Sequence, residues 1–272
     1  MTMATPRNAS VINAFDILRL IAAEGAELTL DRIAERLGLS RAATHRLIAT
    51  LQDTGAVIRL HRNAYMPGPV IAELGAAVDI TGALATMARE PVRRLVRGLQ
   101  EVVHLGAFDG EMVTYLVKGS PRRKTIVPTE EGTQLEAYSS GVGKALLAYL
   151  PDPDLDQYLS DAPFVALTDH TITDPEAMRA ALAEVRMRGY AMDAEEVIPG
   201  LTCLAVPILS PSGQAVASLS VSAATERFTP AFRDDALVML CAEVGGLATR
   251  LFGSSGAATS GWGQVGAHRT KA

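Results

Sequence analysis

The chain has 272 residues, of which 48% are hydrophobic and 20% charged, with a formal net charge of −5 at pH 7. This length and apolar content are enough for two ordinary domains. Residues 1–75 hold 8 Lys and Arg against 7 Asp and Glu, whereas the rest of the chain holds 17 against 23. The acidic balance excludes a bulk nucleic-acid coat, because such proteins bind mainly by neutralising phosphates.

Cysteine content and hydropathy restrict the class of protein further. Only Cys203 and Cys241 are present, which excludes a disulfide scaffold. The N-terminal residues lack the apolar run of a signal peptide, and no stretch approaches about 18 uncharged apolar residues. We therefore expect a cytoplasmic protein with no membrane partner. The Gly-, Ser- and Ala-rich tail over residues 254–272 is expected to be disordered.

The first elements in chain order are short helices. A capped helix over residues 10–18 would bury one apolar stripe, formed by Val11, Ala14, Phe15 and Leu18. A helix over residues 30–37 is predicted from apolar residues at the i, i+3, i+4 and i+7 spacing. Gly38 ends it, and Ser40 is placed to cap the next helix, over residues 41–51. Two short helices joined at a Gly-containing turn are typical of a helix-turn-helix.

The second helix of this pair would read DNA, since its N-terminal residues enter the major groove in a helix-turn-helix. The candidates for contacts with bases or phosphates are Ser40, Arg41, Ala42, Thr44, His45 and Arg46. A strand over residues 56–60 and a returning strand to residue 65 would then form a wing that carries Arg59, His61 and Arg62. Three elements at the right spacing favour a winged helix-turn-helix that binds double-stranded DNA over a helical hairpin with a merely solvated charged face.

The chain after the wing changes character. A helix over residues 70–84, with Pro69 near its start, is predicted to be a linker and a dimer contact. Two hairpins are predicted beyond it, one over residues 102–117 and one over residues 203–222. Helices are expected over residues 91–101, 143–150, 175–188 and 230–252. Hairpins with helices around them indicate an α+β domain on a mainly antiparallel sheet.

Several motifs, in order, resemble those of IclR-family transcriptional regulators over residues 10–252. Besides the winged helix-turn-helix, they are GKALLA at 143–148, TITD at 171–174, RGYAMDAEE at 188–196, GLTCLAVP at 200–207 and SLSVS at 218–222. The resemblance implies a winged helix-turn-helix over residues 1–68, a linker helix over 69–88 and a GAF-like effector domain over 89–253. It also implies a homodimer or homotetramer, and an effector that is a small organic molecule, usually a carboxylate or an aromatic catabolite.

The resemblance further implies an effector site at Gly141, Val142, Asp193, Cys203, Ser220 and Ser222. Independently of it, Ser218, Ser220 and Ser222 alternate with apolar residues, so three hydroxyls share one strand face; a solvent-facing strand is the alternative. Backbone amides at Gly141 and Val142, just before a helix, would hold a carboxylate. Asp193 would repel that anion, so it should accept a proton from the effector or be protonated itself, unless it is only a helix-end carboxylate.

Two positions depart from the family pattern. Tyr138 replaces the usual His before the 141–144 segment and would narrow the pocket or add a phenol partner, which makes it a seventh effector-site candidate. Met66-Pro67-Gly68 replaces the common Leu-Gly at the end of the wing, and Pro67 should stiffen the entry to the linker helix.

Enzyme interpretations find less support. The 141–144 segment fails the phosphate-loop pattern, since Tyr138 stands where Gly is needed and Ala145 where Ser or Thr is needed. No local signature joins Cys203 to His104 or His170 as nucleophile and base. The five His residues offer no His-x₃-His pair, so we expect no metal, no cofactor and no catalytic residue.

The sequence thus predicts a non-enzymatic, ligand-responsive transcriptional regulator that represses or activates. The alternatives are a small-molecule-converting enzyme with a vestigial winged domain and a winged-helix module that binds another protein. The sequence does not choose the effector, the operator, the target genes, or between dimer and tetramer.

Overall fold

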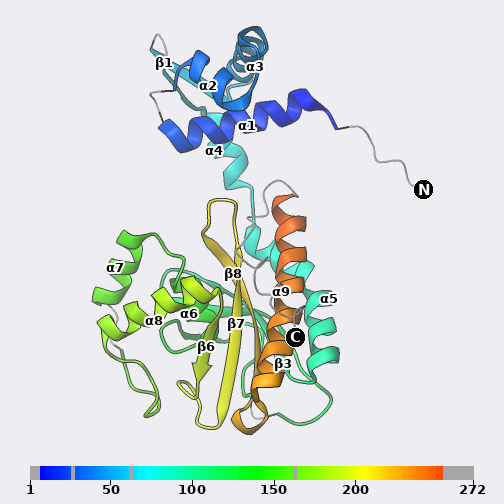
Figure 1. Ribbon diagram of the computed structural model, residues 1–272, viewed down its shortest axis with the longest axis vertical. Helices are drawn as coiled ribbons and strands as arrows, with labels where there is room; N and C mark the ends of the chain where they lie inside the picture. Colours follow the sequence, from blue (N-terminus) through cyan, green and yellow to red (C-terminus); the bar gives the residue numbers. More distant parts are fainter. Residues whose placement is uncertain (1–6, 26–27, 62–63, 126, 162–163, 254–272) are drawn as a thin grey trace, which may run out of the picture. The chain divides into compact units, whose positions relative to one another are not determined.

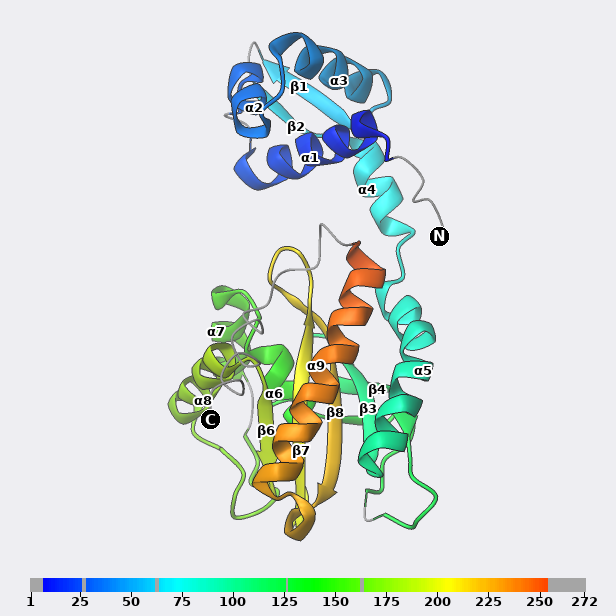
Figure 2. The ribbon, with the colours of Figure 1, turned by 45° about the vertical axis from the view of Figure 1, so that its right-hand side comes forward.

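The computed structural model describes residues 7–25, 28–61, 64–125, 127–161 and 164–253. The chain divides into two units, Met1–Val78 and Asp79–Ala272. Figures 1 and 2 show both units from two directions. The predicted tail over 254–272 lies outside the described residues.

The first unit is a helix-turn-helix followed by a hairpin. Its elements are α1 (Ala9–Glu24), α2 (Leu30–Leu37), α3 (Arg41–Asp53), β1 (Val57–His61), β2 (Ala64–Pro67) and α4 (Pro69–Ala76). Gly38 ends α2 in the left-handed conformation that glycine adopts without strain, with φ at 63°. The Ser40 hydroxyl then accepts a hydrogen bond from the Ala43 amide and caps α3. β1 and β2 pair antiparallel, so the predicted hairpin is confirmed.

The buried face of α1 differs from the predicted one. Val11 and Phe15 are 52% and 57% exposed, whereas Ile17 and Ile21 are fully buried. The helix continues to Glu24, six residues beyond the predicted end. Its second half therefore carries the core contact, and the apolar residues of its first half stay on the surface.

The predicted linker helix over 70–84 is two helices. α4 ends at Ala76, and α5 (Ile80–Leu99) begins after Asp79, whose carboxylate accepts the Gly82 amide at 2.7 Å. The separate helix predicted from Pro91 is also wrong, because Pro91 lies inside α5, where the buried stripe from Leu84 to Leu99 favours one continuous helix. Within the described residues no single helix is long and apolar enough to cross a membrane, although α4 and α5 taken as a broken pair meet that measure of length and composition.

The second unit is built on a six-stranded antiparallel sheet in the order β5-β4-β3-β8-β7-β6. The strands are β3 (Val102–Phe108), β4 (Met112–Gly119), β5 (Gln134–Glu136), β6 (Ala191–Ala194), β7 (Leu201–Leu209) and β8 (Ala215–Ala224). Both predicted hairpins are confirmed, as β3-β4 and β7-β8. The α+β class is confirmed as well.

Helices cover both faces of this sheet (Figures 1 and 2). α5 and α9 (Pro230–Phe252) pack on one face. On the other lie α6 (Gly141–Leu147), α7 (Asp152–Asp161) and α8 (Pro175–Arg188). Because side chains alternate along a strand, β3 sends Val103 and Leu105 toward α5 and α9 but His104 toward the α6 side. This alternation places polar residues of several strands beside α6.

Candidate DNA-reading surface and effector site

The exposed face of α3 carries most of the predicted DNA-reading residues. Arg41, Ala42, His45 and Arg46 are exposed. The Arg41 Nε atom lies 2.9 Å from Asp31 Oδ1, but the two side chains are 77% and 69% exposed. An exposed pair of this kind contributes little stability, so Arg41 is able to exchange Asp31 for a base or a phosphate. Ser40 is committed to capping α3.

Thr44 was expected on this outward face, and that expectation is wrong. Its side chain is fully buried, and its hydroxyl donates a hydrogen bond to the Ser40 carbonyl at 3.1 Å. Thr44, Ile48 and Leu51 follow the i, i+4, i+7 spacing, which makes Thr44 the polar start of the buried stripe. Arg59 and His61 are exposed on β1, and Arg62 lies outside the described residues.

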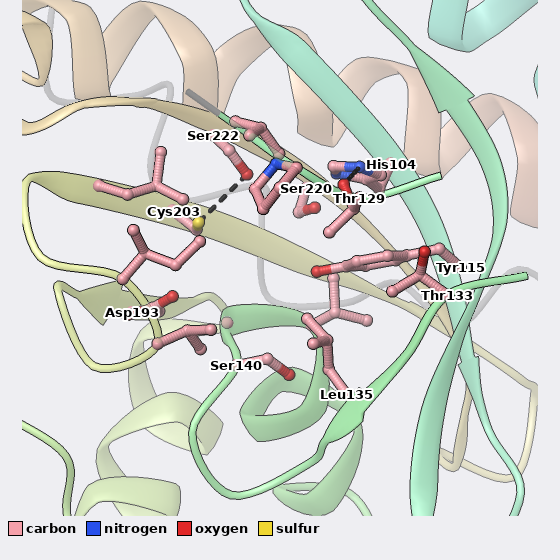
Figure 3. A pocket seen from close by; sticks show the side chains of 17 residues that line it. His104, Tyr115, Thr129, Thr133, Leu135, Ser140, Asp193, Cys203, Ser220 and Ser222 are labelled. Atoms are coloured by element: carbon pink, nitrogen blue, oxygen red, sulfur yellow. Dashed lines mark hydrogen bonds between the residues drawn. The ribbon is translucent and has the colours of Figure 1, made fainter. Parts of the chain in front are cut away.

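The second unit encloses a cavity of about 140 Å³ between the sheet, α6 and the segment after β6 (Figure 3). Six of the seven predicted effector residues line it: Gly141, Val142, Asp193, Cys203, Ser220 and Ser222. They come from α6, β6, β7 and β8. Ser218, Ser220 and Ser222 are all buried, which excludes the solvent-facing strand considered as an alternative.

Tyr138 does not line the cavity, so its assignment to the pocket is wrong. The ring is 1% exposed and packs in the α6–α8 core. Its hydroxyl donates a hydrogen bond to the Val165 carbonyl at 2.9 Å and accepts one from the Val165 amide at 3.1 Å. Tyr138 therefore ties the segment before α6 to the chain after α7, and both hydrogen-bonding functions of the phenol are used there.

Asp193 is the carboxyl group of the cavity. It is 2% exposed, and its Oδ1 atom accepts the Glu196 amide at 2.7 Å. Burial raises the pKa of Asp193 to about 6. The neighbouring Lys144 ammonium forms a buried ion pair with Glu196 instead. Within the described chain no Lys or Arg lines the cavity, so a carboxylate ligand would meet no side-chain cation there.

The opposite end of the cavity holds residues that sequence reasoning missed. His104 Nε2 lies 2.8 Å from Thr129 Oγ1, and the imidazole stacks on Tyr115 with ring centroids 4.1 Å apart. Burial lowers the pKa of His104 to about 3, so the ring is neutral. One signal could have revealed it, since His104 interrupts the apolar run VVHLGAF of a predicted strand. Thr129 and Thr133 come from a loop whose path no local pattern predicts.

The chemistry of the cavity suits binding better than turnover. Burial raises the pKa of the Cys203 thiol well above its usual value, and the thiol donates to Ser222 Oγ at 3.1 Å. It is therefore a neutral hydrogen-bond donor and a poor nucleophile. In the part of the chain that the structure describes, no three His, Cys, Asp or Glu side chains gather in a way that could hold a metal ion.

A helix-turn-helix with an exposed basic helix, followed by a domain that encloses a small polar cavity, defines the class of ligand-responsive DNA-binding regulators. Comparisons with known proteins agree. Residues 10–60 match the model of the IclR helix-turn-helix domain, and residues 78–244 match that of the bacterial transcriptional regulator IclR C-terminal domain. The chain belongs to the IclR family of bacterial transcriptional regulators, which are not enzymes.

Individual relatives extend the match over most of the chain. It is 37% identical to the HTH-type transcriptional regulator BhcR of Paracoccus denitrificans, over 80% of this chain and 78% of that protein. A crystal structure of a putative IclR transcriptional regulator from Silicibacter sp. TM1040 is 30% identical, with a TM-score of 0.67 over 90% of this chain and 96% of that one. An IclR homologue from Microbacterium hydrocarbonoxydans, crystallised with 4-hydroxybenzoate, has the same fold at 22% identity, with a TM-score of 0.58 over 89% and 99%.

Proposed function

We propose that this protein binds a promoter operator in the cytoplasm as a dimer or tetramer and changes its DNA affinity when a small organic acid enters the cavity of the second unit. The observation that carries the proposal is that cavity, in which one buried carboxyl group and several hydroxyls surround an apolar space. Arg41, Ala42, His45 and Arg46 on α3 would face the major groove. Arg59, His61 and Arg62 would contact the backbone.

The effector would contact Asp193, Cys203, Ser220 and Ser222, and the backbone of Gly141 and Val142. The hydroxyls of Ser220 and Ser222 are able both to donate and to accept hydrogen bonds. With no Lys or Arg in the described lining, an acid would bind together with a proton shared with Asp193. The Microbacterium homologue bound to 4-hydroxybenzoate supports an aromatic acid as one candidate.

Self-association would use the apolar surface of the first unit. Val11 and Phe15 on α1 are more than half exposed, and Leu74 and Val78, on and after α4, are 63% and 62% exposed. Large apolar side chains at this exposure favour a protein contact over solvent. A dimer would present two copies of α3 to a palindromic operator.

A footprint of the purified protein on the DNA beside its own gene tests the proposal, in moderate salt with excess nonspecific competitor. We expect protection of two half-sites about 10 bp apart, or a multiple of that spacing. A panel of small carboxylic acids added to the same reaction should include members that shift the protection. Absence of specific sites in a genome-wide selection would contradict DNA reading, and acids without any effect would contradict the effector class.

A further inference from the structure

Three neighbouring polar side chains on the cavity wall find no hydrogen-bond partner at one or more of their atoms. His104 Nδ1 is buried and has none among the described residues. The Ser220 hydroxyl, directly opposite His104 in the β3-β8 register, likewise forms no hydrogen bond within the described ranges. The hydroxyl of Tyr115 also forms no hydrogen bond within the described ranges. The Tyr115 ring stacks on His104, and its hydroxyl points toward the middle of the cavity in Figure 3.

These three groups stand on adjacent strands, β4, β3 and β8, and all three line the cavity. Of the three groups, His104 Nδ1 is fully buried without a partner in the described chain. The Ser220 and Tyr115 hydroxyls belong to residues no more than 6% exposed and open onto the cavity, not onto the outer surface. A buried polar atom without a partner costs about 1–3 kcal/mol, and native proteins contain few of them. Within the described residues, one buried nitrogen without a partner, beside two unpaired hydroxyls that open onto the same cavity, indicates that the ligand supplies the missing hydrogen bonds.

We propose that a hydroxyl group of the effector lies against His104, Ser220 and Tyr115, and that His104 selects hydroxylated acids over their deoxy analogues. This inference rests on the proposed function of the cavity and names the chemistry of its ligand. His104 is thereby a specificity-determining residue at the opposite end of the cavity from Asp193, three strands away in the same sheet.

A hydroxyl group fits this end for two reasons. The neutral imidazole presents at Nδ1 either a lone pair or an N–H, depending on which tautomer Thr129 selects at Nε2. A hydroxyl satisfies both tautomers, because it donates and accepts. A second anionic group would instead need a cation, and the described lining offers neither Lys nor Arg.

The test uses the full-length protein and pairs of acids that differ by one hydroxyl: 4-hydroxybenzoate and benzoate, glycolate and acetate, and lactate and propionate. Two variants separate the ring nitrogens. The amide of His104→Asn falls at the position of Nδ1, whereas that of His104→Gln falls at the position of Nε2 and keeps only the Thr129 contact. Ser220→Ala provides a second probe of the same cluster, and circular dichroism verifies that each variant is folded.

Calorimetry should show that the wild type binds the hydroxylated member of at least one pair about tenfold more tightly than its deoxy partner. The ratio should fall to about twofold or less in His104→Gln and Ser220→Ala, and stay near the wild-type value in His104→Asn. If folded His104→Gln loses the same affinity for both members of a pair, so that the ratio of the two affinities is unchanged, the inference is overturned while the proposed function stays in place. Failure of every acid to bind the wild type would overturn the proposed effector class and the inference with it.

Discussion

At the scale of single residues, Asp193 both forms a structural hydrogen bond and places a titratable group in the cavity. Its carboxyl group accepts the Glu196 amide inside the protein, where water is excluded. Burial disfavours the charged form and raises its pKa to about 6. The protein therefore keeps a group in its cavity that exchanges a proton near physiological pH.

This raised pKa predicts a pH-dependent stability. Below the unfolded-state pKa near 3.9, Asp193 is protonated in both states and has no effect on the free energy of unfolding. Between this value and the folded-state pKa of about 6, only the unfolded state releases the proton, so stability falls as the pH rises, and the loss is complete above pH 6. Relative to Asp193→Asn, the wild type should lose about 3 kcal/mol of unfolding free energy between pH 4 and pH 7.5, an order-of-magnitude figure. Urea unfolding of both proteins across this range measures the difference.

Asp109 is the matched control, because backbone amides of Met112 and Glu111 lower its pKa. The difference in free energy of unfolding between wild type and Asp109→Asn should therefore change with pH in the opposite direction. Asp109 should stabilise the protein above its unfolded-state pKa and lose that effect as the pH falls. A flat difference between wild type and Asp193→Asn would show that Asp193 is not titrated in this range.

At the scale of elements, the exposed face of α3 carries the proposed DNA-reading residues, whereas its buried face packs α3 into the first unit. Arg41→Ala should cost about 1–3 kcal/mol on the cognate site if Arg41 contacts a guanine, and much less on random DNA. Thr44→Val is the control on the same helix. It removes the bond to the Ser40 carbonyl, so about 1 kcal/mol of stability should be lost without a change in DNA affinity. Gel-shift titrations and thermal unfolding measure the two quantities, and an equal loss for Arg41→Ala on both DNAs would make Arg41 a phosphate contact.

The packing of α6 depends on a close backbone approach. A Cβ atom at Gly143 would lie 2.1 Å from the Ala137 carbonyl oxygen, whereas one at Gly141 would meet its nearest atoms at 3.5 Å. Gly143→Ala should therefore destabilise the protein by about 1–3 kcal/mol, and Gly141→Ala by much less. Denaturant unfolding compares the two variants, and equal effects would mean that the contact at Gly143 relaxes freely.

The exposed face of α1 gives a prediction about assembly. Phe15→Lys should weaken self-association, because it places a charge in the proposed apolar contact, and leave the fold intact, because the side chain is 57% exposed. Val165→Lys, with the same exposure in the second unit, is the control. Analytical ultracentrifugation reports the association constant; an unchanged value for Phe15→Lys would move the interface elsewhere.

At the scale of the whole molecule, regulation requires coupling between the two units. Because the coupling free energy is reciprocal, an effector that changes operator affinity about 5- to 150-fold must have its own affinity changed by operator DNA by the same factor. Ser222→Ala should weaken effector binding and leave the DNA affinity of the effector-free protein unchanged. Ser212→Ala, in an exposed turn, is the control. Fluorescence titrations with and without operator DNA test both statements, and loss of effector-free DNA binding in Ser222→Ala would assign Ser222 to folding.

Local sequence chemistry by itself determined the helix-turn-helix, the two hairpins, α8 and α9, because caps, turns and hydrophobic periods act over a few residues. The family motifs located Gly141, Val142, Asp193, Cys203, Ser220 and Ser222, all of which line the cavity. Only the tertiary structure decided which face of α1 is buried, where Thr44 and Tyr138 point, and that α5 continues through Pro91. It also brought His104 and Tyr115 beside Ser220, since strand order and register join residues more than a hundred positions apart, and no local pattern encodes that pairing.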